Sequence, residues 1–373
     1  MTHLSRRNKS LRILHNRNSC TMLKDRSTTT LIFVITFLLV FIMAARSPID
    51  SDMWWHLRAG QETWLLKSPY TIDTLSFTRG GERWISHSWL FELLLYTSYH
   101  ALGYLGICIL VAASAAITMS ILFLQMDEPP IFRSFIIALG SSVASLIWSP
   151  RPQAISLVFL ALTLWILHYF KKKNRNFLVY LLPVFVTWGN LYGGYSLGLM
   201  VLGLLIAGEI LNNLKILKAK PNLNWKQIFI LTGFFILCSL VILINPHGIR
   251  IWTIPFETVN IKTIHLIDEW TPPDFHNLTQ VPFLVFTVLL GISLLFNLRD
   301  IDYTDILYSF WFIAMAFYAK KYFGPAAVVL IPILSKNLWA VLKRLQSRLT
   351  NKIHNQSIKQ TKTLKRSLTI TVN

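Results

Sequence analysis

The residues best suited to chemistry form one short run, Asp50-Ser-Asp-Met-Trp-Trp-His56, which directly follows an apolar segment at 28–45. A carboxylate can deprotonate a hydroxyl group, and an imidazole can transfer protons near neutral pH. If a helix begins near Asp52, then Asp52 and His56 lie four residues apart on one face, and the carboxylate could orient the imidazole. Asp50 is the competing acid. We therefore predict Asp52, Asp50 and His56 as catalytic residues.

Structural roles are the alternative for the same run. Asp50 and Asp52 could cap the helix that follows, because Asp is favoured at helix starts, and Trp54 and Trp55 could be aromatic residues of the membrane interface. Ionisable groups at membrane depth are costly, so catalysis is the stronger interpretation. A divalent ion on Asp50 and Asp52 is a weaker alternative, since the sequence has no strong metal-binding motif.

Other ionisable side chains lie in or beside apolar segments. Glu92 stands within Trp-Leu-Phe-Glu-Leu-Leu-Leu, where a carboxylate needs a cation or a raised pKa. Arg151 stands between two prolines that fix its backbone, and its guanidinium suits an anionic head group, with lipid snorkelling as the alternative. Lys320 and Lys321 adjoin a short apolar segment and need a local partner.

Two turns complete the candidate set. Gly193 and Gly194 predict a close backbone approach, with Asn190 turned into a cavity, and Asn-Pro-His-Gly at 245–248 is a turn signature. We predict substrate-binding or phosphate-binding roles for His87, Glu92, Arg151, Asn190, His247, Arg250, Lys320 and Lys321.

The composition predicts a membrane protein. Hydrophobic residues make up 53% of the 373 residues and charged residues only 14%, and the apolar residues come in blocks between short polar loops. We predict an all-α integral membrane protein of ten spans with a further helix at 89–101 in the membrane interface. The short spans at 177–189, 306–318 and 322–335 suggest helices that end at a water-filled cavity. The ten predicted spans are 28–45, 103–124, 131–148, 153–170, 177–189, 195–211, 228–245, 281–297, 306–318 and 322–335.

The basic residues predict the orientation. Most Lys and Arg residues fall in the tails 1–27 and 336–373 and in loops near 171–175 and 215–226, which are therefore expected in the cytoplasm. The membrane domain is then 28–335, and its loop 46–102 and the other candidate loops lie outside. We expect the net charge of +19 to orient the protein in the cell membrane and to contact anionic membrane lipids, not nucleic acid.

The order of the motifs resembles a known family. A first span is followed by Asp-x-Asp with Trp-Trp-His, Trp-x-x-His-x-Trp-Leu, Asn-x-x-Gly-Gly, Asn-Pro-His-Gly and Glu-Trp-x-Pro-Pro-Asp-Phe. Over roughly 28–335 this order is similar to bacterial multispanning membrane proteins related to the GT-C glycosyltransferases, which include protein mannosyltransferases and aminoarabinose transferases. The resemblance implies a GT-C-like bundle of about ten helices, with the catalytic acid in the first outer loop and a polyprenyl-phosphate sugar as donor.

The same resemblance implies roles for individual residues. A carboxylate at Asp52 or Asp50 would deprotonate the acceptor hydroxyl, and Arg151 with Lys320 or Lys321 would bind the leaving lipid phosphate. We therefore expect an extracytoplasmic glycosyltransferase that moves a sugar to a lipid, glycan or protein acceptor. The alternative is a non-catalytic transporter or binding protein for lipid-linked sugars, because aromatic residues stack on sugars and interrupted helices suit alternating access. No nucleotide-binding fingerprint is present, and no cofactor is predicted.

Overall fold

The protein is a bundle of helices. A computed structural model describes residues 26–46, 50–84, 86–173, 176–214, 221–259, 266–298 and 302–370. Within these ranges all elements of regular secondary structure are helices. The only β-type pairing there is an isolated bridge between Ile72 and Arg83. The predicted all-α class is therefore confirmed. Almost all of the predicted tail 1–27 and half of the basic loop at 215–226 lie outside the described residues.

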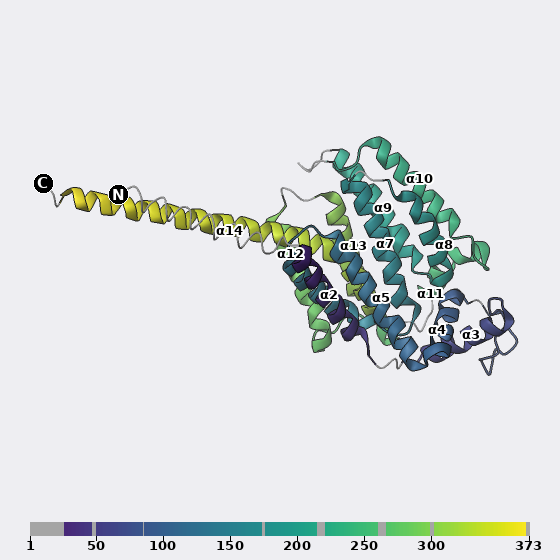
Figure 1. Ribbon diagram of the computed structural model, residues 1–373. Coiled ribbons are helices and arrows are strands. Elements are labelled where there is room, and N and C mark those ends of the chain that lie inside the picture. Colours follow the sequence, from purple (N-terminus) through teal and green to yellow (C-terminus); the bar gives the residue numbers. More distant parts are fainter. Residues whose placement is uncertain are drawn as a thin grey trace.

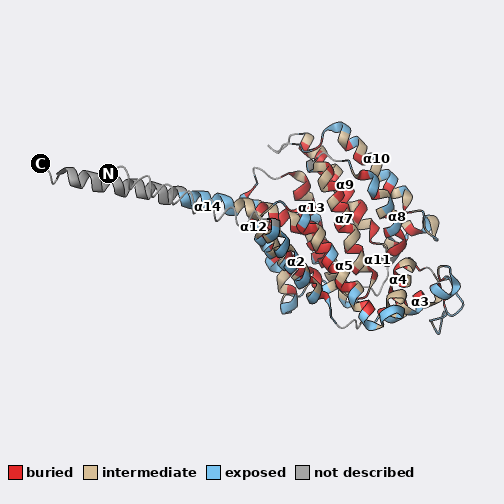
Figure 2. Ribbon diagram, viewed as in Figure 1, coloured by how far each residue is buried: buried red, intermediate tan, exposed pale blue. Residues whose placement is uncertain are grey.

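Long apolar helices lie side by side in the body of the molecule (Figure 1). α5, α7, α9 and the first part of α14 (Phe323–Ile370) carry many buried residues, and the outer helices expose apolar side chains such as Leu39 and Ile42 on α2 (Figure 2). A lipid bilayer would cover such a surface. The helices of the body are α2 (Arg26–Ala44), α5 (Tyr104–Gln125), α6 (Pro130–Ala144), α7 (Pro152–Lys173), α8 (Leu181–Leu191), α9 (Tyr195–Asn213), α10 (Trp225–Val241), α12 (Val281–Phe296) and α13 (Tyr303–Tyr318).

Seven of the described helices are long and apolar enough to cross a membrane. The other three predicted spans coincide with α8, α10 and α13, which have 11, 17 and 16 residues. An all-helical protein of the membrane type is thus confirmed, whereas the count of ten spans is not. The helix predicted at 322–335 does not end at 335. It is the first part of α14 (Phe323–Ile370), which has 48 residues and projects from the bundle (Figure 1).

Two shorter helices carry the first candidate residues. α3 (Met53–Leu66) and α4 (Trp89–Leu102) pack against each other at one end of the bundle (Figure 1). They approach closely at Gly60, where an added Cβ would lie 2.1 Å from the carbonyl oxygen of Glu92. The predicted helix at 89–101 is therefore present as α4, and its packing on α3 fixes the residues at the start of both helices.

Candidate active site

Arg151 gathers three carboxylates from two segments that are far apart in the sequence. Its Nε lies 2.8 Å from Asp50 Oδ1 and 2.9 Å from Oδ2, and its Nη1 lies 3.2 Å from Asp52 Oδ2. The same Nη1 donates to Glu269 Oε2 at 2.7 Å, from the short helix η5 (Asp268–Trp270). We call these four residues the Arg151 cluster. Its contacts exclude the snorkelling alternative, since the guanidinium is held by protein carboxylates.

Arg151 keeps its charge. Burial lowers the pKa of Arg151, but its hydrogen bond to Asp50 and the nearby charges of Glu269, Asp50 and Asp52 outweigh burial, so the net pKa is raised. The guanidinium therefore stays protonated. Three carboxylates around one cation leave an excess of negative charge, which suits the binding of a proton donor.

Asp50 and Asp52 differ in accessibility. The side chain of Asp50 is 12% exposed and also accepts the backbone N–H of Asp52 at 2.9 Å. The side chain of Asp52 is 44% exposed and, although Asp52 occupies the position before α3, it makes no capping hydrogen bond. The capping alternative is therefore wrong for Asp52, which is the more accessible base of the two.

Lys320 and Lys321 both have the local partners that their position requires. Lys320 Nζ lies 2.6 Å from Asp268 Oδ1, and Lys321 Nζ lies 3.4 Å from the ring centroid of Trp270. Among the described residues, no carboxylate lies within ion-pairing distance of Lys321. A cation–π contact leaves the ammonium group able to bind an anionic ligand. Lys321 is therefore better placed than Arg151 or Lys320 to bind a phosphate.

Two cavities meet at this end of the bundle. The first, which we call the polar cavity, has a volume of about 510 Å³ and is bordered by Asp50, Arg151 and Glu269. The second, the apolar cavity, has a volume of about 300 Å³ and lies largely between α7, α9, α13 and α14. Its apolar wall consists of Ile147, Leu157, Leu160, Leu197, Met200, Ile254, Pro255, Met315 and Pro325. Both cavities share Ile147, Gln153 and Lys321.

His56 faces Glu92 and not Asp52. Its Nδ1 lies 3.3 Å from Glu92 Oε1, and Ser86 and Ser88 donate to the same carboxylate at 2.5 and 3.2 Å. The side chain of Glu92 is fully buried, so these three donors replace the water that it has lost. The predicted orientation of the imidazole by Asp52 is therefore wrong, and Glu92 with His56 stabilises the contact between α3 and α4.

His87 links this region to the cavities. It lines the apolar cavity, and its ring centroid lies 6.1 Å from that of Tyr192. Burial lowers the pKa of His87 to about 4, against the opposing charge of Glu92, and burial also raises the pKa of the Tyr192 phenol. Both groups are neutral at physiological pH, so the wall they form can donate hydrogen bonds but carries no charge.

Asn190 and His247 hold backbone segments together. Asn190 accepts the indole N–H of Trp89 at 3.0 Å and donates to the carbonyls of Val186 and Ile244, so it does not turn into a cavity as predicted. His247 Nε2 donates to the carbonyl of Ser86 at 2.8 Å.

The close approach predicted for the glycine pair is present at Gly194, where a Cβ would lie 2.2 Å from Ser156 Oγ. Arg250 is exposed on η3 (Gly248–Trp252).

The carboxylates do not offer an open metal site. Among the described residues, no group of three or more His, Cys, Asp or Glu side chains could hold an ion. A divalent ion between Asp50 and Asp52 would have to displace the guanidinium that both carboxylates share. The donor set of this site therefore fits a cationic side chain and not a metal.

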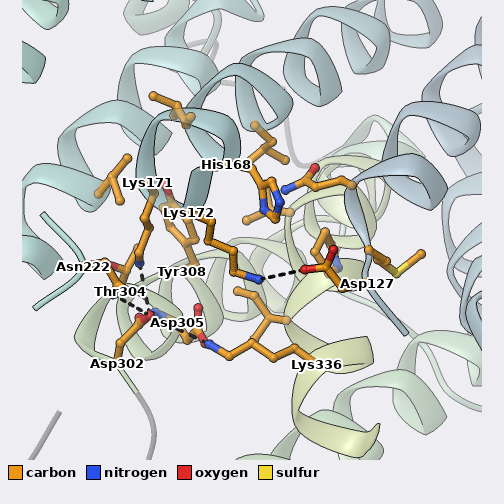
Figure 3. Close-up of a pocket in the computed structure, with 18 of the residues that line it drawn as sticks. Asp127, His168, Lys171, Lys172, Asn222, Asp302, Thr304, Asp305, Tyr308 and Lys336 are labelled. Atoms are coloured by element: carbon orange, nitrogen blue, oxygen red, sulfur yellow. Dashed lines mark hydrogen bonds and ion pairs between the residues drawn. The ribbon is translucent and has the colours of Figure 1, made fainter. Parts of the chain in front are cut away.

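A second polar site lies among residues outside the predicted set. Asp302 and Asp305 are both buried beside Lys171 and Lys336 at a cavity of about 130 Å³ (Figure 3). We call this the lysine cavity. One signal was available: an Asp-x-x-Asp pattern directly before an apolar run is a helix start, and Asp302 does accept the N–H of Asp305 at 2.8 Å.

Comparison with known proteins identifies no relative. Neither protein-family models nor the curated proteins contain a match to this chain.

Proposed function

We propose that the protein is a glycosyltransferase of the cell membrane that uses a polyprenyl-phosphate sugar. The observation that carries the proposal is the pair of cavities that share Lys321. A lipid-linked sugar needs an apolar path for its chain, a cation at its phosphate, and a polar space with a base for the acceptor. The apolar cavity, Lys321 and the carboxylates beside the polar cavity supply these three needs.

The residues suggest a sequence of events. Asp52 accepts the proton of the acceptor hydroxyl, and the oxygen attacks the anomeric carbon of the donor. The bond between that carbon and the phosphate oxygen breaks, and the lipid phosphate leaves with its charge beside Lys321. Arg151 acts as a positioning residue, because it holds the two loops that carry Asp52 and Glu269 at a fixed separation.

Asp52→Asn tests the proposal directly. The amide keeps the size of the side chain but cannot accept the proton, and general-base catalysis is worth typically ~10²–10⁴ in rate. Purified protein in nanodiscs is assayed for sugar transfer from a radiolabelled polyprenyl-phosphate donor to a membrane-lipid extract. We expect Asp52→Asn to lose at least 100-fold in turnover and to keep its affinity for the donor.

The matched control is Asp274→Asn, an exposed acid on a neighbouring loop that pairs with His276. It should leave turnover unchanged. Full activity of Asp52→Asn would remove Asp52 from the mechanism. Donor binding without turnover in the wild-type protein would favour the alternative, a binding protein or transporter for lipid-linked sugars.

A further inference from the structure

The lysine cavity lies at the end of the bundle opposite to the Arg151 cluster. Arg151 directly precedes α7 and Lys171 stands near the end of α7, so a rise of 1.5 Å per residue separates them by about 30 Å. The cavity is enclosed by the ends of α5 and α7, the start of α13, and α14. It therefore cannot be part of the candidate active site.

The deep charges of the lysine cavity are paired within the protein. Lys171 Nζ lies 2.9 Å from Glu209 Oε1 and 3.1 Å from Asp302 Oδ2. Lys336 Nζ lies 2.6 Å from Asp305 Oδ2. Figure 3 shows Lys171 directed at Asp302 and Lys336 directed at Asp305. Pairing of this kind offsets the cost of removing the charges from water.

The cavity as a whole carries excess negative charge. Its walls hold Lys171, Lys172 and Lys336 against Asp127, Glu128, Asp302 and Asp305; Glu209 lies behind Lys171, and Arg133 lies near Asp127 and Glu128. Four cations therefore face five carboxylates. Asp127 and Glu128 are at the mouth, where Lys172 lies 3.9 Å from Asp127 and Ser335 donates to Glu128 at 2.8 Å. This balance favours a cationic ligand and disfavours an anionic one.

A buried acceptor is left without a hydrogen bond in the same cavity. Gln125, at the end of α5, is 8% exposed and lines the cavity, and its Oε1 has no hydrogen-bond partner. A buried carbonyl oxygen without a donor is unfavourable, so a ligand that brings an N–H would be stabilised here. The charge excess and the unpartnered oxygen are independent observations that require the same chemistry.

We propose that the lysine cavity binds the primary ammonium group of a small amine, of the ethanolamine type. An ammonium group has three N–H donors, which can reach Gln125 Oε1 and the carboxylates at the mouth. An apolar protein cavity of about 150 Å³ binds benzene, so about 130 Å³ holds an aminoethyl group but not a sugar. The same group occurs on free amines and on the head group of phosphatidylethanolamine.

Titration of the full-length protein tests the ligand class. Ethanolamine, choline and inorganic phosphate are titrated by calorimetry into protein in maltoside micelles, in a buffer free of primary amines. We expect ethanolamine to bind and choline, whose ammonium has no N–H, to bind at least tenfold more weakly. Equal binding of choline and ethanolamine, or binding of phosphate alone, would overturn the proposal.

Nanodiscs distinguish the source of the amine. If the head group is the ligand, phosphatidylethanolamine in a phosphatidylcholine disc raises the melting temperature above that in phosphatidylcholine alone. If only a free amine enters, ethanolamine binds and the lipid has no effect; either result supports the ammonium site. Absence of both effects would contradict it.

Variants locate the site. Gln125→Met keeps the shape of the side chain and removes the acceptor, and Glu128→Gln keeps a hydrogen bond to Ser335 and removes the charge. Each should weaken ethanolamine binding by roughly tenfold or more, because a hydrogen bond to a charged group is lost. Gln61→Met, on α3 at the other end of the bundle, is the matched control and should bind like the wild type. Unchanged binding in Gln125→Met and Glu128→Gln would place the amine elsewhere.

Discussion

Two cations near the candidate active site differ in what surrounds them. Arg151 is held by three carboxylates, whereas Lys321 lies on the face of Trp270 and lines both cavities. A guanidinium already held by acids has little remaining capacity for an anionic ligand, so we propose that Arg151 positions the loops and that Lys321 binds the phosphate. The resemblance to transferases implied phosphate binding for either residue, and only the contacts separate them.

Lys321→Met should impair the release of the lipid phosphate. The substitution keeps an apolar side chain against Trp270 and removes the charge, and loss of one stabilising group at a developing charge costs roughly 10²-fold in turnover. The measurement is donor turnover in nanodiscs. Arg79→Gln, which removes an exposed cation paired with Glu82, is the control and should retain turnover. Normal turnover in Lys321→Met would exclude this lysine as the phosphate ligand.

The neutral state of His87 makes the protein sensitive to acid. Burial lowers its folded-state pKa to about 4 from the usual 6.5, so the unfolded chain binds the proton first as the pH falls. The stability due to the neutral imidazole is complete above pH 6.5 and is lost toward pH 4, and it amounts to roughly 3 kcal/mol. The melting temperature should therefore decrease less between pH 7.5 and pH 5 in His87→Gln than in the wild type. His276→Gln, at a fully exposed position, should behave like the wild type; an equal acid response in His87→Gln would refute a role for His87.

At the scale of elements, the contact of α3 with α4 determines where Asp52 lies. Gly60 lets the two helices approach, and the buried Glu92 carboxylate with His56 joins them a turn earlier on α3. Asp52 immediately precedes α3, so a displacement of that helix would move the base relative to Lys321. The position of the proposed base, Asp52, thus depends on Gly60, Glu92 and His56, which do not themselves border the two cavities.

Gly60→Ala should disturb this contact. Its Cβ would lie 2.1 Å from the carbonyl oxygen of Glu92, which belongs to helix backbone and cannot rotate away. Overpacking of this kind costs typically ~1–3 kcal/mol, so both the melting temperature and turnover should fall. Gly203→Ala on α9 is the matched control, because its nearest neighbour is 3.8 Å away. Wild-type stability in Gly60→Ala would show that α3 adjusts freely.

Part of this arrangement could be predicted from the sequence. The apolar blocks predicted the helices, and the costly polar residues beside them predicted Asp50, Asp52, Arg151 and Lys321 as residues of one site. The pairing of Asp50 with Arg151 joins positions 101 residues apart, and nothing local encodes it. The predicted partner of His56 was wrong for the same reason. Helix spacing favoured Asp52, but the buried Glu92 carboxylate needs hydrogen-bond donors, and His56 lies beside it.

For the whole molecule, the two polar sites lie at opposite ends of one helical bundle. The Arg151 cluster and its cavities are at the start of α7, and the lysine cavity is at its end, where α14 leaves the bundle (Figure 1). The sequence predicts most basic residues on the same side of the membrane as the second end, which is the reason to expect that end in the cytoplasm. The span count does not fix the orientation, because seven helices qualify by length where ten were predicted.

Thiol labelling of single-cysteine proteins decides the orientation. After replacement of the native cysteines, His276→Cys reports the end with the Arg151 cluster and Gln346→Cys reports α14, since both positions are exposed. We expect a membrane-impermeant maleimide to label His276→Cys in intact cells and Gln346→Cys only after permeabilisation, because the basic end is expected in the cytoplasm. Labelling after permeabilisation also shows that each cysteine is accessible. The reverse pattern would place Asp52 and Lys321 in the cytoplasm, where an outward-facing sugar donor could not reach them, and would therefore contradict the proposed function as well as the orientation.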